Sequence, residues 1–286
     1  MKKLSAAALA VSLALLLCGC AVTSFGSYED RGFTAAVGVV SAGDADEIEI
    51  HWVTGSIEIE EADVREITFF ETDANGKKTD ALGEAAKNKE LSESLRMRYK
   101  SSDGKLEIRF CKSDLRVRSG AVENLNKRLT VRVPAGTSLR AVEIDAVSSD
   151  VSATGISSEK MQLNGVSASL ELKGCTVRDL DCETVSGNIS VVSASVIDDI
   201  TVHSVSGEIN VEMPGIVRLD ADCVSAGLSL VLSEADFTLD LGGLSADVAA
   251  DGVEYTKISD KSYKFGKGTG EARVESVSGK IRVTVK

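Results

Sequence analysis

Aromatic residues, prolines and histidines are scarce in this sequence. Of its 286 residues, only 4% are aromatic, two are proline and two are histidine, whereas hydrophobic residues make up 43%. The apolar residues are therefore mainly valine, isoleucine, leucine and alanine, which suit narrow, regular stacks of strands better than a bulky mixed core. With only His51 and His203 present, sites that require several histidine ligands cannot be assembled.

Positive charge is also in short supply. The net charge is −12, and an acidic surface repels phosphate backbones, which excludes nucleic acid as the expected partner. The same charge argues against attachment to a membrane through a polybasic patch. Phosphate-binding loops, dinucleotide fingerprints and CxxC motifs are absent from the sequence, so we expect no organic cofactor.

The N-terminus has the pattern of an export signal. Two lysines precede an apolar run over positions 4–17, which is too short to span a bilayer comfortably. The run ends in Leu17-Cys18-Gly19-Cys20, which resembles a bacterial lipobox, with a small residue before the cysteine that receives the lipid. No later apolar stretch approaches the length of a membrane-spanning helix.

We therefore predict a lipoprotein signal peptide over residues 1–19, followed by a lipidated Cys20 and a tether over residues 20–34. The predicted location is extracytoplasmic, with the N-terminal lipid in a bacterial membrane of the cell envelope. Stable anchoring requires more than one acyl chain, which a lipobox cysteine carries. The alternative is an ordinary secretory signal with incidental cysteines.

A short phrase recurs through the second half of the chain. It begins at Val147, Val166, Val185, Val205, Val224, Leu244 and Val277, with successive spacings of 19, 19, 20, 19, 20 and 33. A fixed period of this size is typical of repeat architectures.

Within each repeat, apolar and polar residues alternate, which predicts strands with one buried face. The positions four and six residues into the phrase are apolar, as in Ile189 and Val191; those five and three residues before it are mostly apolar, and the residue before it is small. The predicted fold is all-β, a parallel β-helix-like β-solenoid of stacked 19–20-residue coils over residues 141–286. One such coil cannot bury its apolar face alone, but a stack can.

The region 35–140 is predicted to continue the same stack. Val53–Ile59 repeats the phrase in the same register, and Trp52 just before it could cover the start of the apolar stack. An inserted hairpin is predicted to turn at Asp103-Gly104. We therefore expect the solenoid to begin before residue 60, accept a long insertion and resume near Val142.

Four cysteines remain after the predicted processing site: Cys111, Cys175, Cys182 and Cys223. An even number in an exported protein suggests disulfides. Cys182 and Cys223, however, occupy inward columns two coils apart, roughly 10 Å by the strand spacing, which is too far for a disulfide. We therefore predict that both are buried free thiols.

These phrases resemble a known bacterial family labelled "putative adhesin", a domain of unknown function found in envelope proteins. The resemblance rests on the strand Leu129–Pro134 and on the phrases that begin at Val185, Val205 and Val277, and it covers roughly residues 35–286. Several phrases depart from it, with serine or alanine in the glycine position: Ser149, Ala168, Ala226 and Ala246. The resemblance implies a β-solenoid and an envelope location, and it implies adhesion by name alone.

A column of serines follows the first residue of each phrase, as in Ser186 and Ser206. A serine nucleophile needs a base within hydrogen-bond reach, and neither histidine lies in a nucleophile motif. The interpretation that we favour is a ladder of hydroxyl groups that satisfies backbone groups at tight corners.

The outward positions before the phrase form an acidic face. Those four before it include Glu143, Asp181, Asp220 and Asp240, and those two before it include Asp145, Glu183, His203 and Asp222. The face is predicted to be mainly a solvated, aggregation-resistant surface, since acidic and neutral residues largely alternate along it. Weak binding of a divalent cation such as Ca²⁺, for example at Asp220, Asp222 and Asp240, is an alternative. Catalysis on an acidic polysaccharide is disfavoured because we expect no Arg or Lys nearby.

His203 is predicted to lie between Glu183 and Asp222 in its column. A zinc site requires several converging ligands, and a set of histidines and cysteines cannot be assembled around it. We therefore expect a surface histidine flanked by acids.

The sequence favours a lipid-anchored, non-enzymatic envelope scaffold that presents a repetitive surface to a protein or glycan. Two alternatives remain open: an enzyme that acts on envelope or host polysaccharide, and a cation-dependent sensor or structural module of the envelope. The sequence names no ligand.

Overall fold

The computed structural model describes residues 31–35, 38–73, 76–77, 95–112, 126–192, 194–243 and 246–286. The predicted signal peptide and Cys20 lie outside these residues. All the regular elements of the described chain are β-strands, so the all-β prediction is confirmed. A helix that could cross a membrane is not found among the described residues.

The strands follow one another from β1 to β19. Those of the N-terminal part are β1 (Gly38–Val40), β2 (Ala45–Ala62), β3 (Ile67–Thr72), β4 (Arg98–Ser102), β5 (Gly104–Arg109), β6 (Lys127–Pro134), β7 (Ser138–Thr154), β8 (Ser157–Gly165) and β9 (Leu170–Lys173). Those of the C-terminal part are β10 (Thr176–Ser186), β11 (Ile189–Val192), β12 (Ser195–Met213), β13 (Arg218–Leu232), β14 (Phe237–Gly243), β15 (Ala246–Asp251), β16 (Tyr255–Ser259), β17 (Ser262–Phe265), β18 (Gly270–Ser276) and β19 (Gly279–Val285).

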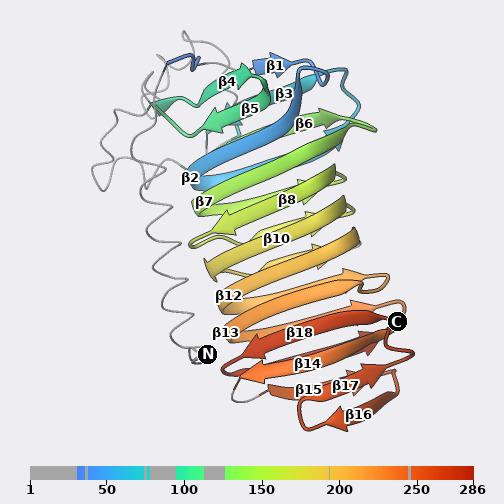
Figure 1. The fold of residues 1–286 in the computed structure, drawn as a ribbon. Coiled ribbons are helices and arrows are strands. Elements are labelled where there is room, and N and C mark those ends of the chain that lie inside the picture. Colours follow the sequence, from blue (N-terminus) through green and yellow to red (C-terminus); the bar gives the residue numbers. More distant parts are fainter. Residues whose placement is uncertain are drawn as a thin grey trace.

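In the middle of the molecule, each strand pairs in parallel with its counterpart in the next repeat. Cys182 on β10 pairs with Leu163 on β8 and with Val202 on β12, and Val202 pairs with Ala221 on β13. All four of these side chains are buried. Figure 1 shows these strands lying across the molecule like rungs, which makes the fold β-solenoid-like and agrees with the predicted register.

The C-terminal end departs from the order that the sequence suggests. Strand β13 pairs with β18 and β19, and β14 and β15 pair with the opposite edges of those two strands. The repeat that begins at Val277 therefore lies between the fifth and sixth repeats, as Figure 1 shows for β18 between β13 and β14. The hairpin of β16 and β17 supplies the chain length for this return.

The N-terminal end is rearranged in the same way. Strand β2 pairs with β7 on one side, with Ile57 opposite Val151, and with β5 and β6 on the other side. The region predicted as an insertion thus contributes a coil of its own, beyond β2. Trp52 is fully buried inside the stack, edge-on to Phe110, so the prediction that it covers the end was wrong.

Antiparallel strands flank the two end coils. A purely parallel solenoid would contain no such strands. Strand β4 pairs antiparallel with β5 across the predicted turn at Asp103-Gly104, and both turn residues have positive φ. Strand β3 pairs antiparallel with β6, and β17 pairs antiparallel with β14. These strands satisfy backbone groups that would otherwise form open, association-prone edges.

A buried ion pair lies at the N-terminal end of the core. Lys127 is fully buried, and its Nζ donates to Glu71 Oε2 at 2.8 Å and to the carbonyl oxygens of Leu95 at 2.7 Å and Phe110 at 2.5 Å. Burial lowers the pKa of Lys127, while the Glu71 carboxylate acts to raise it. With all three protons donated, the ammonium group joins β3 and β6 to the segments around β4 and β5.

Each coil turns a corner between its two strand segments, and the Ser-Gly pair of the phrase lies at this corner. Gly207 has a φ of +128°, and a Cβ placed there would lie 2.0 Å from the carbonyl oxygen of Gly187 in the neighbouring coil. The Ser206 hydroxyl donates to the carbonyl oxygen of Val185 at 3.3 Å. Glycine permits the close approach of the coils, and serine satisfies a backbone acceptor at the same corner.

The four cysteines in the described residues are all buried and free, as predicted for Cys182 and Cys223. Burial raises the pKa of both of these thiols. They remain protonated at neutral pH and act as small apolar side chains of the core.

We expect Ile189→Asp and Val211→Asp to unfold the protein, because both side chains are fully buried and an unpaired buried charge costs several kcal/mol. The matched control is Asn210→Asp, beside Val211 on the outward side of β12, which should cost about 0.5 kcal/mol or less. Urea denaturation followed by circular dichroism measures all three. Equal stability of the three variants would contradict the register.

Candidate functional site

One outward face of the stack carries two rows of polar side chains. Each coil has two strand segments, one before and one after the corner, and we call the outward side of the segments before the corner the first-arm face. It is formed by β5, by the first halves of β2, β7, β12 and β13, and by β8, β10, β18 and β14. In stacking order, one row is Arg109, His51, Asp145, Asn164, Glu183, His203, Asp222, Glu275 and Gly242. The adjacent row is Glu107, Glu49, Glu143, Gln162, Asp181, Thr201, Asp220, Arg273 and Asp240.

At the N-terminal part of this face, basic side chains are in contact with the acidic ones. His51 lies between two carboxylates: its Nε2 contacts Glu49, and its Nδ1 lies 3.0 Å from Asp145 Oδ2. Two basic side chains also pair with Glu49, Lys105 directly and Arg109 with Nη2 at 3.1 Å from Oε1. Burial acts to raise the pKa of Asp145, but hydrogen bonds from His51 and Asn164, together with nearby positive charge, hold it below its usual value.

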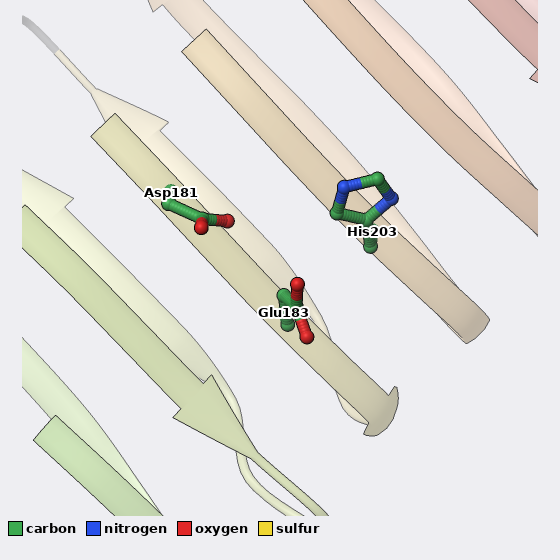
Figure 2. A group of neighbouring side chains, drawn as sticks. All are labelled: Asp181, Glu183 and His203. Carbon is green, nitrogen blue, oxygen red and sulfur yellow. The ribbon is translucent and has the colours of Figure 1, made fainter. Parts of the chain in front are cut away.

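The middle of the face is different. Asp181 and Glu183 lie two residues apart on β10, so they point to the same side, and His203 on β12 is the register neighbour of Glu183. One potential ligand atom from each of the three lies within 4.8 Å of the other two, and Figure 2 shows the three side chains on one surface of adjacent strands. All three are partly buried.

This environment is unfavourable to negative charge. Burial raises the pKa of Asp181, and burial together with the charge of Asp181 raises the pKa of Glu183. Oδ1 of Asp181 is shielded from solvent and accepts no hydrogen bond from any described residue. The pair therefore favours a proton or a cation beside it.

His203 has a carboxylate partner on its far side. Its Nδ1 lies 3.3 Å from Asp222 Oδ2 on β13. Burial acts to lower the pKa of His203, but the interaction with Asp222 and the charges of Glu183 and Asp181 outweigh it and raise the pKa above its ordinary value. The predicted position of His203 between Glu183 and Asp222 is observed, and Asp181 joins them.

The structure does not assemble the cation site predicted at Asp220, Asp222 and Asp240. Arg273 on β18 lies between Asp220 and Asp240, since it is the register neighbour of both. A guanidinium group in this position repels a cation, so a Ca²⁺ ion shared by the three aspartates is not supported. The expectation was wrong because it stacked the coils in sequence order.

Arg273 also corrects the expectation that this face lacks basic residues. Together with Arg218, Asp220 and Asp240 it lines an open hollow of about 430 Å³ at the C-terminal part of the face. Arg273 pairs with Glu275, and Arg218 pairs with Asp199. The hollow therefore presents alternating cationic and anionic groups.

Two serines of the column and both histidines are engaged in contacts other than a nucleophile–base pair. The hydroxyls of Ser206 and Ser278 donate to backbone carbonyl oxygens of the neighbouring coil, whereas His51 and His203 contact carboxylates. This agrees with the interpretation of the serine column as a ladder at the corners. Asp181 was not identified from the sequence as a neighbour of His203. The predicted register would have shown it, because Asp181 lies two residues before Glu183, which was placed beside His203.

Comparisons with known proteins find a matching family model and similar solved structures. The family model described as Toastrack DUF4097 matches residues 45–284. The chain is similar to a crystal structure of a "putative cell adhesion protein" from Clostridium sporogenes, with 10% identity, coverage of 89% of this chain and 100% of that chain, and a TM-score of 0.40. It is also similar to a "putative adhesin" from Bacteroides fragilis, with 12% identity, coverage of 88% and 97%, and a TM-score of 0.47. The search of curated proteins gives no match.

The raised pKa of His203 makes a prediction about stability and pH. Protonated His203 stabilises the folded state fully below the unfolded-state value of 6.5, and this contribution is lost as the pH rises through the raised folded-state pKa. In Asp222→Asn the pKa of His203 should fall. Because the chain has two histidines, an NMR titration in the presence of a chelator resolves His203 from His51. A His203 pKa that is the same in wild type and Asp222→Asn would contradict this assignment.

Proposed function

The chain belongs to the Toastrack DUF4097 family, and from this premise we propose that it is a non-enzymatic binding scaffold of the cell envelope, anchored by a lipid on Cys20. Membership confirms the family resemblance carried by the repeated phrases. The proposed partner is a glycan or protein at the envelope or cell surface.

The observation that carries this proposal is the first-arm face itself. Its two rows run from the β5 coil to the β14 coil without a change of register, apart from local irregularities outside the rows. Side chains spaced about 4.8 Å apart along the stack form a regular array of hydrogen-bonding groups. Such an array suits an extended polymer better than a small molecule.

A glycan is favoured over a protein by the hollow at the C-terminal part of this face. Carboxylates accept hydrogen bonds from sugar hydroxyls, and guanidinium groups donate to them and to sugar carboxylates. Asp220 and Asp240 supply the first kind of group, and Arg218 and Arg273 supply the second. The hollow is open to solvent on one side, which allows a long chain to continue past it.

The proposal of a non-enzymatic role is supported by the contacts of the titratable groups. Both histidines contact carboxylates, and two of the corner serines are hydrogen-bonded to the backbone. The Cys182 and Cys223 thiols have raised pKa values because they are buried in the core. None of these contacts pairs a nucleophile with a base among the described residues. The alternative is an enzyme that cleaves polysaccharide, and the observation that favours it is the position of Arg273 beside Asp220 and Asp240. The binding experiment below also tests this alternative.

The lipid anchor is tested in cells. We expect the wild-type protein to sediment with membranes and to incorporate a labelled fatty acid, and Cys20→Ser to lose both properties, because the thiol of Cys20 is the predicted acylation site. The matched control is Cys18→Ser, which leaves Gly19-Cys20 intact. If labelling persists in Cys20→Ser and disappears in Cys18→Ser, the lipidated residue is Cys18 and the assignment to Cys20 is wrong.

Binding is tested on a glycan array and by pull-down from the native envelope. We expect Arg273→Glu to weaken binding about tenfold, roughly 1.4 kcal/mol, because it reverses a charge in the hollow. The control is Arg282→Glu, which is exposed on β19 away from the first-arm face. Equal binding by the two variants would contradict the assignment of this face, and release of shortened glycan would indicate an enzyme.

A further inference from the structure

We propose that Asp181, Glu183 and His203 bind a divalent transition-metal ion of the Zn²⁺ class. The inference concerns the same face as the proposed function, but it requires no partner and is tested separately. It rests on the geometry of the three side chains, on oxygen atoms beside them that lack a hydrogen-bond donor, and on a comparison with His51.

The three side chains converge closely enough to share an ion. Their ligand atoms lie within 4.8 Å of one another. A Zn²⁺ ion binds nitrogen and oxygen ligands at about 2.0–2.2 Å, so two ligands of one ion lie roughly 3–4 Å apart. All three residues are partly buried rather than locked in the core, and small side-chain rotations can close the remaining gap.

Two shielded oxygen atoms at this place accept no hydrogen bond from the described part of the chain. They are Asp181 Oδ1 and Asn164 Oδ1. The Nδ2 group of Asn164 donates to Asp145 Oδ1 at 2.8 Å, and Asn164 is also the register neighbour of Glu183. Flipping the amide would instead place two acceptors, Asn164 Oδ1 and the Asp145 carboxylate, against each other. A cation beside Glu183 and Asp181 supplies the positive charge that these oxygens lack.

His203 is oriented as a metal ligand. Its Nδ1 faces Asp222 Oδ2 at 3.3 Å, so Nε2 is the nitrogen left to coordinate. Figure 2 shows one ring nitrogen on the side of β10, which carries Asp181 and Glu183, and the other facing away. The contact with Asp222 is within ion-pair distance but outside hydrogen-bond geometry, and a carboxylate at the far nitrogen favours a proton there and raises the basicity of the coordinating nitrogen, as is common at metal-bound histidines.

His51 provides an internal comparison on the same face. It also contacts two carboxylates, Glu49 and Asp145, and Lys105 and Arg109 pair with Glu49, although Arg109 is shared with Glu107. Among the described residues, Asp181 and Glu183 have no arginine or lysine within ion-pair distance, although Lys160 acts on Asp181 at longer range. A histidine beside two carboxylates thus occurs twice on this face. At His51 basic side chains are in ion-pair contact with the carboxylates, and at Asp181 and Glu183 none of the described residues supplies one.

The donor set selects the class of ion. Calcium and magnesium prefer sites composed of oxygen ligands, whereas an imidazole nitrogen with two carboxylates suits Zn²⁺ and neighbouring transition-metal ions. Three protein ligands leave a fourth position of a tetrahedral ion open. Water, or a group of a bound partner, would occupy it.

The test is isothermal titration of the full-length, detergent-solubilised protein, first stripped with a chelator, with ZnCl₂ and with CaCl₂. We expect one saturable Zn²⁺ site and little response to Ca²⁺. Glu183→Gln and His203→Gln should lose the site, and Asp222→Asn should weaken it about 10–100-fold. The matched control is Glu208→Gln, an exposed carboxylate of β12 outside the first-arm face, which should bind as the wild type does.

NMR of the wild type removes the risk that a variant fails to fold. Zn²⁺ should shift the imidazole signals of His203 and leave those of His51 unchanged. A flat Zn²⁺ titration of the wild type, or Zn²⁺ binding that survives in folded His203→Gln, would overturn the proposal. Because the glycan assay can be performed with chelator present, failure of the metal site and failure of the scaffold function give different results.

Discussion

Parallel strands stack about 4.8 Å apart, so corresponding side chains of neighbouring coils lie at this spacing. The inward columns must therefore be apolar in each coil, because each coil buries its apolar residues only between two neighbours. Leu163, Cys182, Val202 and Ala221 illustrate this, as four small or medium apolar residues that are successive register partners and are all buried. The low aromatic content follows from the same constraint, since a large ring must find space in the coils above and below it.

The ends of the stack are where this constraint is hardest to meet. An end coil has a neighbour on one side only, and aromatic and charged residues gather there. Phe237 and Phe265 stack at 4.8 Å between ring centroids at the C-terminal end, and Lys127 and Glu71 pair beneath the N-terminal strands. Antiparallel strands then occupy edges that parallel coils would leave open. At each end an inner coil is embedded by an outer one: β5 and β6 cover the first coil, β2, and β14 and β15 cover the last coil, β18 and β19.

The predictable part of the fold follows from the periodicity of the sequence. Alternation of apolar and polar residues fixes which side of a strand is buried, and the longer repeat fixes which residues are neighbours, so the pattern alone places Ile189 and Val211 inward. The order of the end coils could not be obtained in this way. All phrases are alike, so the coils of the phrases at Leu244 and Val277 fit equally well against the coil of Val224, and the periodicity does not show which of them lies next to it. Arg273 was misplaced for this reason, and with it the predicted site at Asp220, Asp222 and Asp240.

Stacking also determines what the outward face can do. Side chains one repeat apart in the sequence become neighbours at a distance where like charges repel strongly, so each row must alternate sign, include neutral residues or acquire a counterion. Near His51 the chain supplies Arg109 and Lys105, and near Asp220 it supplies Arg273. At Asp181 and Glu183 it supplies one histidine, already oriented by Asp222. Asp181 and Glu183 thus lie where none of the described arginine or lysine side chains is in ion-pair contact with them, and this is where an ion, or a cationic group of a partner, gains by binding.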